Sequence, residues 1–374
     1  MSRSPRLLAC VTVALVACGS DVPSLAQSSA FTVTEVAQLN EPWAMTFLPD
    51  GRLLITERRG ALKVYEVGGD AVDVAGVPEV SYGGQGGLGD VVLHPDFPGN
   101  GLVYLSYAES GVGNTSGAAV ARARLVLDGE RAALENLEVV WRQVPKVTGR
   151  GHFGHRIAFD ADGYLWISSG ERQKFDPAQD MQANLGKILR LNDDGSVPAG
   201  NPFGDQGEIT AQIWSLGHRN PLGLAFDAQG RLWNVEMGPR GGDELNLVRR
   251  GANYGYPVVS NGDHYDGRDI PDHDTRPDLV APAVSWNPVI SPSSLMFYSG
   301  GEFPDWRGDA FIGGLSSESL VRIEIDVESA REAQRFAMGE RIREVEQGPD
   351  GAIWLLEDEE DGSGGRLLRL SAPE

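Results

Sequence analysis

The feature that most constrains the fold is a turn-and-strand unit that occurs six times along the chain. In each unit a glycine turn leads into a short apolar strand, as at Asp162-Gly163 before YLWISSG and Asp350-Gly351 before AIWLLED. The other turns are Pro49-Asp50-Gly51, Gly99-Asn100-Gly101, Gln229-Gly230 and Arg307-Gly308. A glycine turn beside alternating or continuous apolar residues is typical of a β-hairpin. We therefore expect a β protein built from repeated hairpins.

The spacing of these units favours a propeller. From Phe31 onward they average about 58 residues each, and units repeated at such intervals indicate a solenoid or a propeller. The near absence of amphipathic helices favours the propeller, so the sequence predicts an all-β, six-bladed β-propeller. One short helix is expected around Pro177 to Gly186, and the segment 239–300 is read mainly as loops. A β-sandwich with a second domain is the alternative, but no linker-like change of composition follows residue 30.

The N-terminus has the composition of a secretory leader. Arg3 and Arg6 precede an uncharged, mostly apolar stretch over 7–17, which is shorter than the ~20 residues that a membrane span needs. The sequence LVAC ending at Cys18 resembles a bacterial lipobox, with cleavage before Cys18 and lipidation of its thiol. Cleavage after Ala26, where small residues occupy the last and third-last positions of SLA, is the alternative.

These signals divide the chain into three parts. We expect residues 1–17 to be a signal peptide of the lipoprotein type, 18–30 a tether and 31–374 a single six-bladed propeller domain. The predicted location is the periplasm, at the outer membrane of a Gram-negative cell, with membrane contact only through a lipid on Cys18. Cleavage after Ala26 would instead give a soluble periplasmic protein.

Composition excludes several classes of function. The chain has 32 Lys and Arg against 53 Asp and Glu, a net charge of −21, which argues against a nucleic-acid partner. The two cysteines, Cys10 and Cys18, lie in the leader region, so neither a disulfide framework nor a cysteine-based metal centre is expected. The GGQGGLG stretch at 83–89 contains GxGxxG, but strand-like DVVLHPDF follows where a dinucleotide site needs a helix.

The segment GHFGHRIAFD at 151–160 offers a candidate general base. His152 and His155 precede an expected strand, and histidine is the side chain whose ordinary pKa lies nearest neutrality. We favour His152 as the base and assign His155 to packing. Glu171 follows the next strand and could orient His152. A packing or surface role for both histidines is the alternative.

Two further constellations suit an anionic ligand and a cation. Arg219 and Asn220 precede another strand, while Arg341 and Arg343 alternate and should point to the same side. Fixed guanidinium groups suit carboxylate and carbonyl oxygens. Segment 236–257 adds backbone carbonyls and the acids Asp243 and Glu244, the hard ligands that calcium prefers. The alternatives are arginines that tie loops together and a solvated strand face. The acidic loop 263–274 does not match an EF-hand and is read as solvated.

Taken together, these segments resemble the soluble pyrroloquinoline quinone (PQQ)-dependent glucose/sorbosone dehydrogenase family, and most closely its aldose sugar dehydrogenase branch. The resemblance runs from about Leu39 to Leu370 and is most specific in GHRNPLGLAFD, EMGPRGGDELNL and GANYGYP. Supporting stretches are GGQGGLG, GHFGHRIAF, GKILRLNDDGSVPAGNPF and RIREVEQGPDG. The family fold is a six-bladed propeller, in agreement with the turn count.

The resemblance implies oxidation of the anomeric carbon of an aldose to a lactone, with hydride passing to PQQ and then electrons to an external acceptor, a quinone or a cytochrome. It implies that His152 is the catalytic base, that Glu171 is its acidic partner, and that Arg219 stabilises charge developing on the cofactor. The implied cofactor contacts are Gln85, Arg219, Asn220, Tyr265, Arg341 and Arg343. The carbonyls of Gly238 and Pro239 are implied ligands of a calcium ion at the cofactor, and Glu244 and Tyr254 those of a second, structural calcium ion.

Two positions depart from the family pattern. Glu171 stands where the family usually has Asp, in Gly170-Glu171-Arg172 instead of Gly-Asp-Gln-Gly, and a lysine near PQQ in some members aligns with Ser316. Two other functions remain open on the sequence. One is a calcium-dependent propeller hydrolase, such as a lactonase, that uses the acids of 236–244; the other is a non-catalytic propeller that binds glycans or a partner.

Overall fold

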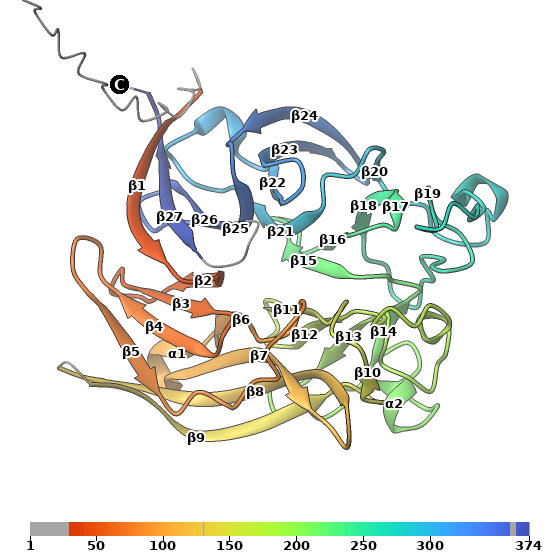
Figure 1. The fold of residues 1–374 in the computed structure, drawn as a ribbon, viewed down its shortest axis with the longest axis horizontal. Coiled ribbons are helices and arrows are strands. Elements are labelled where there is room, and N and C mark those ends of the chain that lie inside the picture. Colours follow the sequence, from red (N-terminus) through yellow and green to blue (C-terminus); the bar gives the residue numbers. More distant parts are fainter. Residues whose placement is uncertain (1–29, 130, 360–363, 374) are drawn as a thin grey trace, which may run out of the picture.

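The structure is a computed structural model that describes residues 30–129, 131–359 and 364–373, and its described part is almost entirely β. Sheets follow one another around a common centre, in the manner of a propeller (Figure 1). Helices in this part are short: α1 (Phe97–Asn100), α2 (Glu208–Ala211) and three 3-10 turns. The all-β class predicted from the sequence is confirmed.

The largest sheet joins two groups of four strands and has the order β2-β3-β4-β5-β9-β8-β7-β6. Each group is antiparallel, and the groups meet where β5 and β9 pair in parallel at Val74 and Ala75 with Ala132 and Ala133. Its strands are β2 (Pro42–Phe47), β3 (Leu53–Glu57), β4 (Ala61–Tyr65), β5 (Ala71–Ala75), β6 (Leu88–Leu93), β7 (Leu102–Ser110), β8 (Thr115–Asp128), β9 (Arg131–Arg142) and the short β10 (Val147–Thr148), which pairs with β8. The count of six blades stays a prediction, because this sheet joins two groups into one.

The other large sheets have four strands each. One contains β11 (Gly154–Phe159), β12 (Leu165–Ser169), β13 (Lys187–Leu191) and β14 (Ile213–Leu216). The next contains β15 (Pro221–Phe226), β16 (Leu232–Glu236), β18 (Asp243–Leu247) and β20 (Val284–Trp286), and the one after it β21 (Pro292–Phe297), β22 (Ala310–Gly314), β23 (Ser319–Asp326) and β24 (Ser329–Ala337). A two-stranded sheet of β17 (Arg240–Gly241) and β19 (Gly262–Asp263) lies beside them.

The last sheet joins the two ends of the described chain. Its order is β1-β27-β26-β25, with β1 (Thr32–Leu39), β25 (Arg341–Gln347), β26 (Ile353–Asp358) and β27 (Gly365–Ser371). The ion pair of Glu35 with Arg366, at 3.2 Å, links β1 and β27 across 331 positions of sequence. Pairing of the first strand with the last therefore closes the arrangement.

Six inner strands surround the centre. The strands β2, β6, β11, β15, β21 and β25 contact one another in this order, and β25 contacts β2. Each has a register shift near its start, at Pro42/Ala44, Leu88/Val91, Gly154/Ile157, Pro221/Gly223, Pro292/Ser294 and Ile342/Glu344. Such bulges increase the local twist and redirect the flanking side chains. The first residues of all six strands are thus directed by a bulge at the same end of the ring.

The six predicted glycine turns each join an inner strand to the next strand of its sheet. The last glycine of each turn has positive φ, between 68° at Gly101 and 91° at Gly308. Glycine adopts this conformation without the steric cost that a Cβ would bring. The last glycines of the predicted turns therefore stand where the backbone needs a positive φ.

The core lies between neighbouring groups of strands. Each of six hydrophobic clusters combines side chains of two adjacent groups, as Leu54 of β3 does with Leu105 of β7, or Trp233 of β16 with Ile312 of β22. These side chains are fully buried. Burial of apolar surface between the groups is the main force that holds them together.

Two expectations need correction. The helix expected around Pro177 to Gly186 is only a three-residue 3-10 turn, Asp176–Ala178. The carbonyls of Pro177 and Ala178 accept from the buried Nζ of Lys187, and a carbonyl with a side-chain partner contributes less to a helix. The segment 239–300, which was expected to form loops, contains the strands β17, β18, β19, β20 and β21 as well as loops. The predicted leader and all but Ala30 of the tether lie outside the described residues. Among the described residues, no helix has the length and apolarity of a membrane span.

Candidate functional site

The predicted site residues gather at one end of the ring. Gln85 precedes β6, His152 precedes β11, and Arg219 and Asn220 precede β15. Others follow the second strand of a sheet: Glu171 comes after β12, and Gly238 and Pro239 after β16. The two arginines of RIRE lie at the start of β25. The bulged strand entrances therefore bring together residues that are far apart in the sequence.

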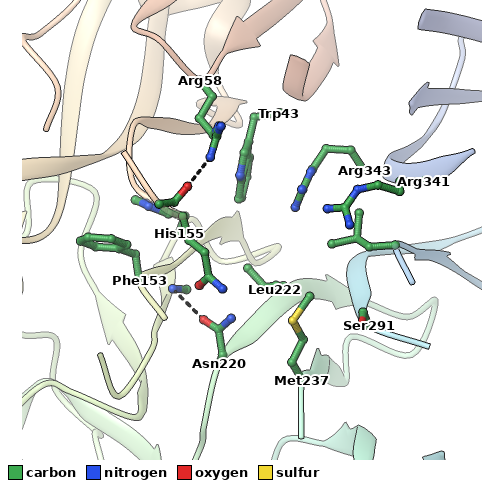
Figure 2. A pocket seen from close by; sticks show the side chains of 14 residues that line it. Trp43, Arg58, Phe153, His155, Asn220, Leu222, Met237, Ser291, Arg341 and Arg343 are labelled. Atoms are coloured by element: carbon green, nitrogen blue, oxygen red, sulfur yellow. Dashed lines mark hydrogen bonds between the residues drawn. The ribbon is translucent and has the colours of Figure 1, made fainter. Parts of the chain in front are cut away.

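Four of these residues line a cavity of about 300 Å³ at the centre of the ring: Gln85, Asn220, Arg341 and Arg343. Figure 2 shows the two arginines on one side of this central cavity and Phe153 and His155 on the other, with Trp43, Leu222 and Met237 also in its wall. The cavity thus combines apolar and aromatic walls with fixed cationic and amide groups. Such a lining suits a flat ligand that carries acidic groups.

Arg341 and Arg343 point to the same side, as the sequence predicted. Their Nε atoms donate to the two oxygens of Asp358, at 2.6 and 2.8 Å. Burial would raise the pKa of Asp358, but the two guanidinium groups hold it below its ordinary value. Two positive charges therefore share one negative charge, which leaves this wall of the central cavity with an excess of positive charge.

A second cavity, of about 240 Å³, is lined by five of the other predicted residues, His152, Glu171, Arg219, Pro239 and Tyr265, while Gly238, Glu244 and Tyr254 line neither cavity. The two cavities adjoin along Gln85 and His152, since the backbone N–H of His152 donates to Oε1 of Gln85 at 2.7 Å. The wall of the second cavity also includes the aromatic side chains of Phe175 and Tyr256, which stack at 6.3 Å, and His264. The predicted site is thus divided between two neighbouring spaces.

His152 and Glu171 form a buried hydrogen-bonded pair between Nδ1 and Oε1. The other oxygen of Glu171 accepts from the backbone N–H groups of Lys174 and Phe175, the latter at 2.7 Å, so the carboxylate is fixed on both sides. The extra methylene of Glu171 is accommodated by this loop. The structure therefore brings the two predicted residues together, while their catalytic role stays a prediction.

The protonation of this pair favours a free nitrogen on His152. Burial lowers the pKa of His152 below its ordinary value, although the hydrogen bond to Glu171 acts in the opposite direction. Burial acts to raise the pKa of Glu171, but the hydrogen bond with His152 holds it below its ordinary value. A neutral ring that donates from Nδ1 to the ionised Glu171 has its lone pair on Nε2, and no described residue hydrogen-bonds with Nε2. His152 is thus arranged as a proton acceptor.

Arg219 and Asn220 carry donors that their neighbours do not use. Nη1 of Arg219 donates to the carbonyls of Met237 and Gly238, at 3.0 and 2.6 Å. Its Nε and the side-chain Nδ2 of Asn220 are buried and have no partner among the described residues. Buried polar groups are normally hydrogen-bonded, so these two unpaired donors fit an acceptor-rich group such as a quinone or a carboxylate. Tyr265 lies at the mouth, 73% exposed, with its hydroxyl 3.4 Å from Nη2 of Arg219.

The carbonyls of Gly238 and Pro239 have the chemistry of calcium ligands, although that of Gly238 accepts from Nη1 of Arg219 in this structure. Asp243 fixes this segment, since Oδ1 accepts from the N–H of Gly238 at 2.8 Å, and burial raises the pKa of Asp243 to about 6. Pro239 reaches the wall of the second cavity. Backbone carbonyls are hard oxygen ligands of the type calcium takes. Within the described part of the chain, however, no group of three or more His, Cys, Asp or Glu side chains is arranged to hold a metal.

Glu244 and Tyr254 do not fit a second calcium ion in the same way. The imidazole of His273 lies at both of them: Nε2 is 3.0 Å from the carbonyl of Tyr254 and 3.9 Å from Oε1 of Glu244. An organic side chain thus contacts the oxygens that the resemblance assigns to an ion.

Several residues of the central cavity were not found from the sequence, among them Arg58 and Trp43. Arg58 follows β3, donates to the carbonyl of Gly84, and pairs with Glu41 at 2.9 Å. Trp43 stands at the entrance of β2, with the guanidinium of Arg156 4.3 Å from its ring. Trp43 could have been predicted from the sequence, because it lies at the start of an inner strand, as the predicted residues of other units do. Arg58 could not have been predicted, because a charged residue at a turn is common.

Comparisons with known proteins agree with this geometry. Residues 39–369 match the model of a family described as Glucose / Sorbosone dehydrogenase. The chain is 40% identical over 367 residues to the aldose sugar dehydrogenase YliI of Escherichia coli K12, a match that covers 94% of this chain and 97% of that protein.

Solved structures give the same relationship. The soluble aldose sugar dehydrogenase of Escherichia coli in the apo-form superposes with a TM-score of 0.87 at 38% identity, over 92% of this chain and all of that one (100%). The PQQ-bound aldose sugar dehydrogenase of Streptomyces coelicolor superposes with a TM-score of 0.73 at 29% identity, over 93% of this chain and 100% of the other.

Proposed function

The chain belongs to the glucose/sorbosone dehydrogenase family of oxidoreductases that act on sugars, and from this premise we propose that it oxidises the anomeric carbon of aldoses to lactones with PQQ and calcium. The observation that carries the proposal is the hydrogen-bonded pair of His152 and Glu171, which leaves Nε2 of His152 free. His152 lines the second cavity, which adjoins the central cavity lined by Arg341 and Arg343. A relative of this chain is known with PQQ bound.

In this proposal the chain positions the sugar and moves one proton. PQQ, when bound, supplies a two-electron acceptor for the hydride that leaves the anomeric carbon. His152 takes the proton of the anomeric hydroxyl at Nε2, and the C–O bond becomes the carbonyl of the lactone. Glu171 stabilises the positive charge that develops on the imidazole. The aromatic wall of Phe175 and Tyr256 offers an apolar surface for the sugar ring.

The donors for the cofactor come from this chain's own residues. Arg341 and Arg343 would hold its carboxylates, because their shared Asp358 leaves an excess positive charge. The unpaired donors of Arg219 and Asn220 would hold further oxygens. Gly238 and Pro239 would offer carbonyls to the calcium ion, whose charge polarises the quinone.

We also propose six blades and export from the cytoplasm. The nine-stranded sheet would count as two blades, since it consists of two antiparallel groups of four strands, with β10 added, that meet only at β5 and β9. The ring of six inner strands supports this count. The leader supports a periplasmic location with a lipid on Cys18, or a soluble protein if cleavage follows Ala26.

The first experiment is reconstitution. Purified protein titrated with PQQ and calcium should take up PQQ in a 1:1 ratio by absorbance, and then reduce a dye with aldoses. His152→Ala should lower kcat by about 10²- to 10⁴-fold, the range for loss of a general base, while PQQ uptake is retained. Failure of every aldose, or an unchanged rate in His152→Ala, would overturn the proposal. Lactone hydrolysis without PQQ would support the hydrolase alternative instead.

A further inference from the structure

A buried histidine joins the residues that the family resemblance assigns to a structural calcium ion. Glu244 lies on β18, Tyr254 follows in the loop after it, and His273 begins a 3-10 turn over His273–Thr275. All three are buried. Nε2 of His273 lies 3.0 Å from the Tyr254 carbonyl and 3.9 Å from Oε1 of Glu244, so the ring stands where those two oxygens converge.

The His273 ring contacts oxygen atoms of two other segments. Nε2 faces the Tyr254 carbonyl, which can only accept, and Nδ1 lies 3.3 Å from Oδ1 of Asn261. That oxygen also accepts from the backbone N–H of His273 at 3.3 Å, while the amide nitrogen of Asn261 donates to Ser285, which fixes the orientation of the amide. Both ring nitrogens therefore lie beside oxygen atoms, those of the Tyr254 carbonyl and the Asn261 amide.

The ring lies beside a buried pair of carboxyl groups. Glu244 pairs with Glu236 across β16 and β18, and one amide, Nδ2 of Asn246, donates to both carboxylates at 3.0 Å. Glu236 has a second partner in His218, at 3.1 Å. Buried carboxyl groups are costly unless they have partners, and the His273 imidazole is the ring that faces Glu244 among the described residues, with Nε2 3.9 Å from Oε1.

We propose that the His273 imidazole takes the place of a structural calcium ion in this chain, by joining Glu244, the Tyr254 carbonyl and Asn261. The loop between β18 and β20, which projects from the body of the molecule in Figure 1, is then held by a side chain and not by a metal. This loop carries Tyr256, His264 and Tyr265 of the second cavity. The inference concerns a site separate from the Gly238–Pro239 carbonyls and does not depend on the proposed reaction.

Equilibrium dialysis with radioactive calcium, in the absence of PQQ, tests the proposal. His273→Ala frees the oxygens of Glu244, Tyr254 and Asn261, and we expect it to bind one more calcium ion per chain than the wild type. His273→Ala combined with Glu244→Gln should return to the wild-type value, and Glu244→Gln alone should leave that value unchanged. His94→Ala, which removes a histidine from another sheet, is the matched control and should bind as the wild type does.

Two results would overturn the proposal. One is the loss of a calcium ion from Glu244→Gln alone, because the wild type would then already hold an ion there. The other is a folded His273→Ala that gains no calcium. If circular dichroism shows that His273→Ala does not fold, a crystal structure of the wild type grown with calcium decides: an ion between Glu244 and Tyr254 refutes the proposal, and the imidazole in that place supports it.

Discussion

At the residue scale, the Glu171 carboxylate shows how a longer acid can serve the same histidine. One oxygen meets Nδ1 of His152, and the other is held by the N–H groups of Lys174 and Phe175. The sequence left open whether the extra methylene disturbs the pair. The backbone of 174–175 answers this, because it supplies donors at the point that the longer side chain reaches.

The charge of Glu171 should set the pH dependence of the reaction. The active form of His152 is neutral, so kcat/KM rises with pH through the pKa of this residue. Burial lowers that pKa and Glu171 raises it. Glu171→Gln should therefore move the acid limb of the kcat/KM profile to lower pH, and should lower the plateau by about 10- to 1,000-fold because the imidazolium loses its counter-charge.

Dye-reduction kinetics between pH 4 and 9 measure both effects, and Glu171→Asp is the matched control that keeps the charge. An acid limb that moves to higher pH in Glu171→Gln, or an unchanged plateau, would show that Glu171 does not act on His152 in this way.

At the scale of the element, hydroxyl groups support the bulged strand entrances. The N–H of Ala44 in β2 donates to Thr56 of β3, that of Asp90 in β6 to Ser106 of β7, and that of Arg156 in β11 to Ser168 of β12, at 3.0, 2.7 and 3.0 Å. Each hydroxyl satisfies an amide near a bulge. Two of them also donate onward to the next inner strand, Thr56 to the Gly89 carbonyl and Ser168 to that of Pro221.

Loss of one such hydroxyl should weaken two strands at once. Ser168→Ala leaves the N–H of Arg156 and the carbonyl of Pro221 without this partner, and both are buried. We expect the free energy of unfolding to fall by about 1–3 kcal/mol, the usual cost of unsatisfied buried groups. Urea denaturation checks this. Ser329→Ala, at an exposed turn, should stay within about 0.5 kcal/mol of the wild type, and an equal loss in both variants would refute the role given to Ser168.

The glycine turns could be predicted from the sequence and the bulges could not. A turn such as Asp162-Gly163 is a local signal, because positive φ is a property of the glycine itself. A bulge depends on the register of a strand with its partner strand. Which backbone N–H is left for a serine or threonine hydroxyl is therefore decided only when the two strands pair. The strand β18 was missed for a related reason, because its sequence DELNL is polar. Its acids are buried through bonds that form only in the folded chain: Asp243 accepts from the N–H of Ile290, and Glu244 from Asn246 of the same strand.

At the scale of the whole molecule, the sequence predicted residues that the structure brings near one another, but not their division between two cavities. His152, Asn220 and Arg343 lie at strand entrances that a propeller brings to one end, so their proximity follows from the topology. The separation of the cavities by Gln85 and His152 depends on side-chain contacts across 67 positions of sequence. No local pattern reports such a contact.

Closure of the molecule should depend on Phe31. This side chain, 2% exposed, precedes β1 and packs on Phe336 of β24 at 4.9 Å, so it ties the closing sheet to its neighbour. Phe31→Ala should lower the free energy of unfolding by about 3–5 kcal/mol, the range for large-to-small changes in a core. Val112→Ala, at a site 94% exposed, is the control and should change stability little. Denaturation by urea measures both, and a loss below about 1 kcal/mol in Phe31→Ala would refute this role.

The pairing of β1 with β27 also fixes an order of events during biosynthesis. A ribosome makes β1 first and β27 last, and the Glu35–Arg366 contact spans 331 positions. The first strand must therefore wait, with unpaired backbone groups, until nearly the whole polypeptide has emerged. Contacts of such long range make folding slow and leave strand edges open to aggregation. The β1 strand of a nascent chain thus stays without its partner until β27 has been made.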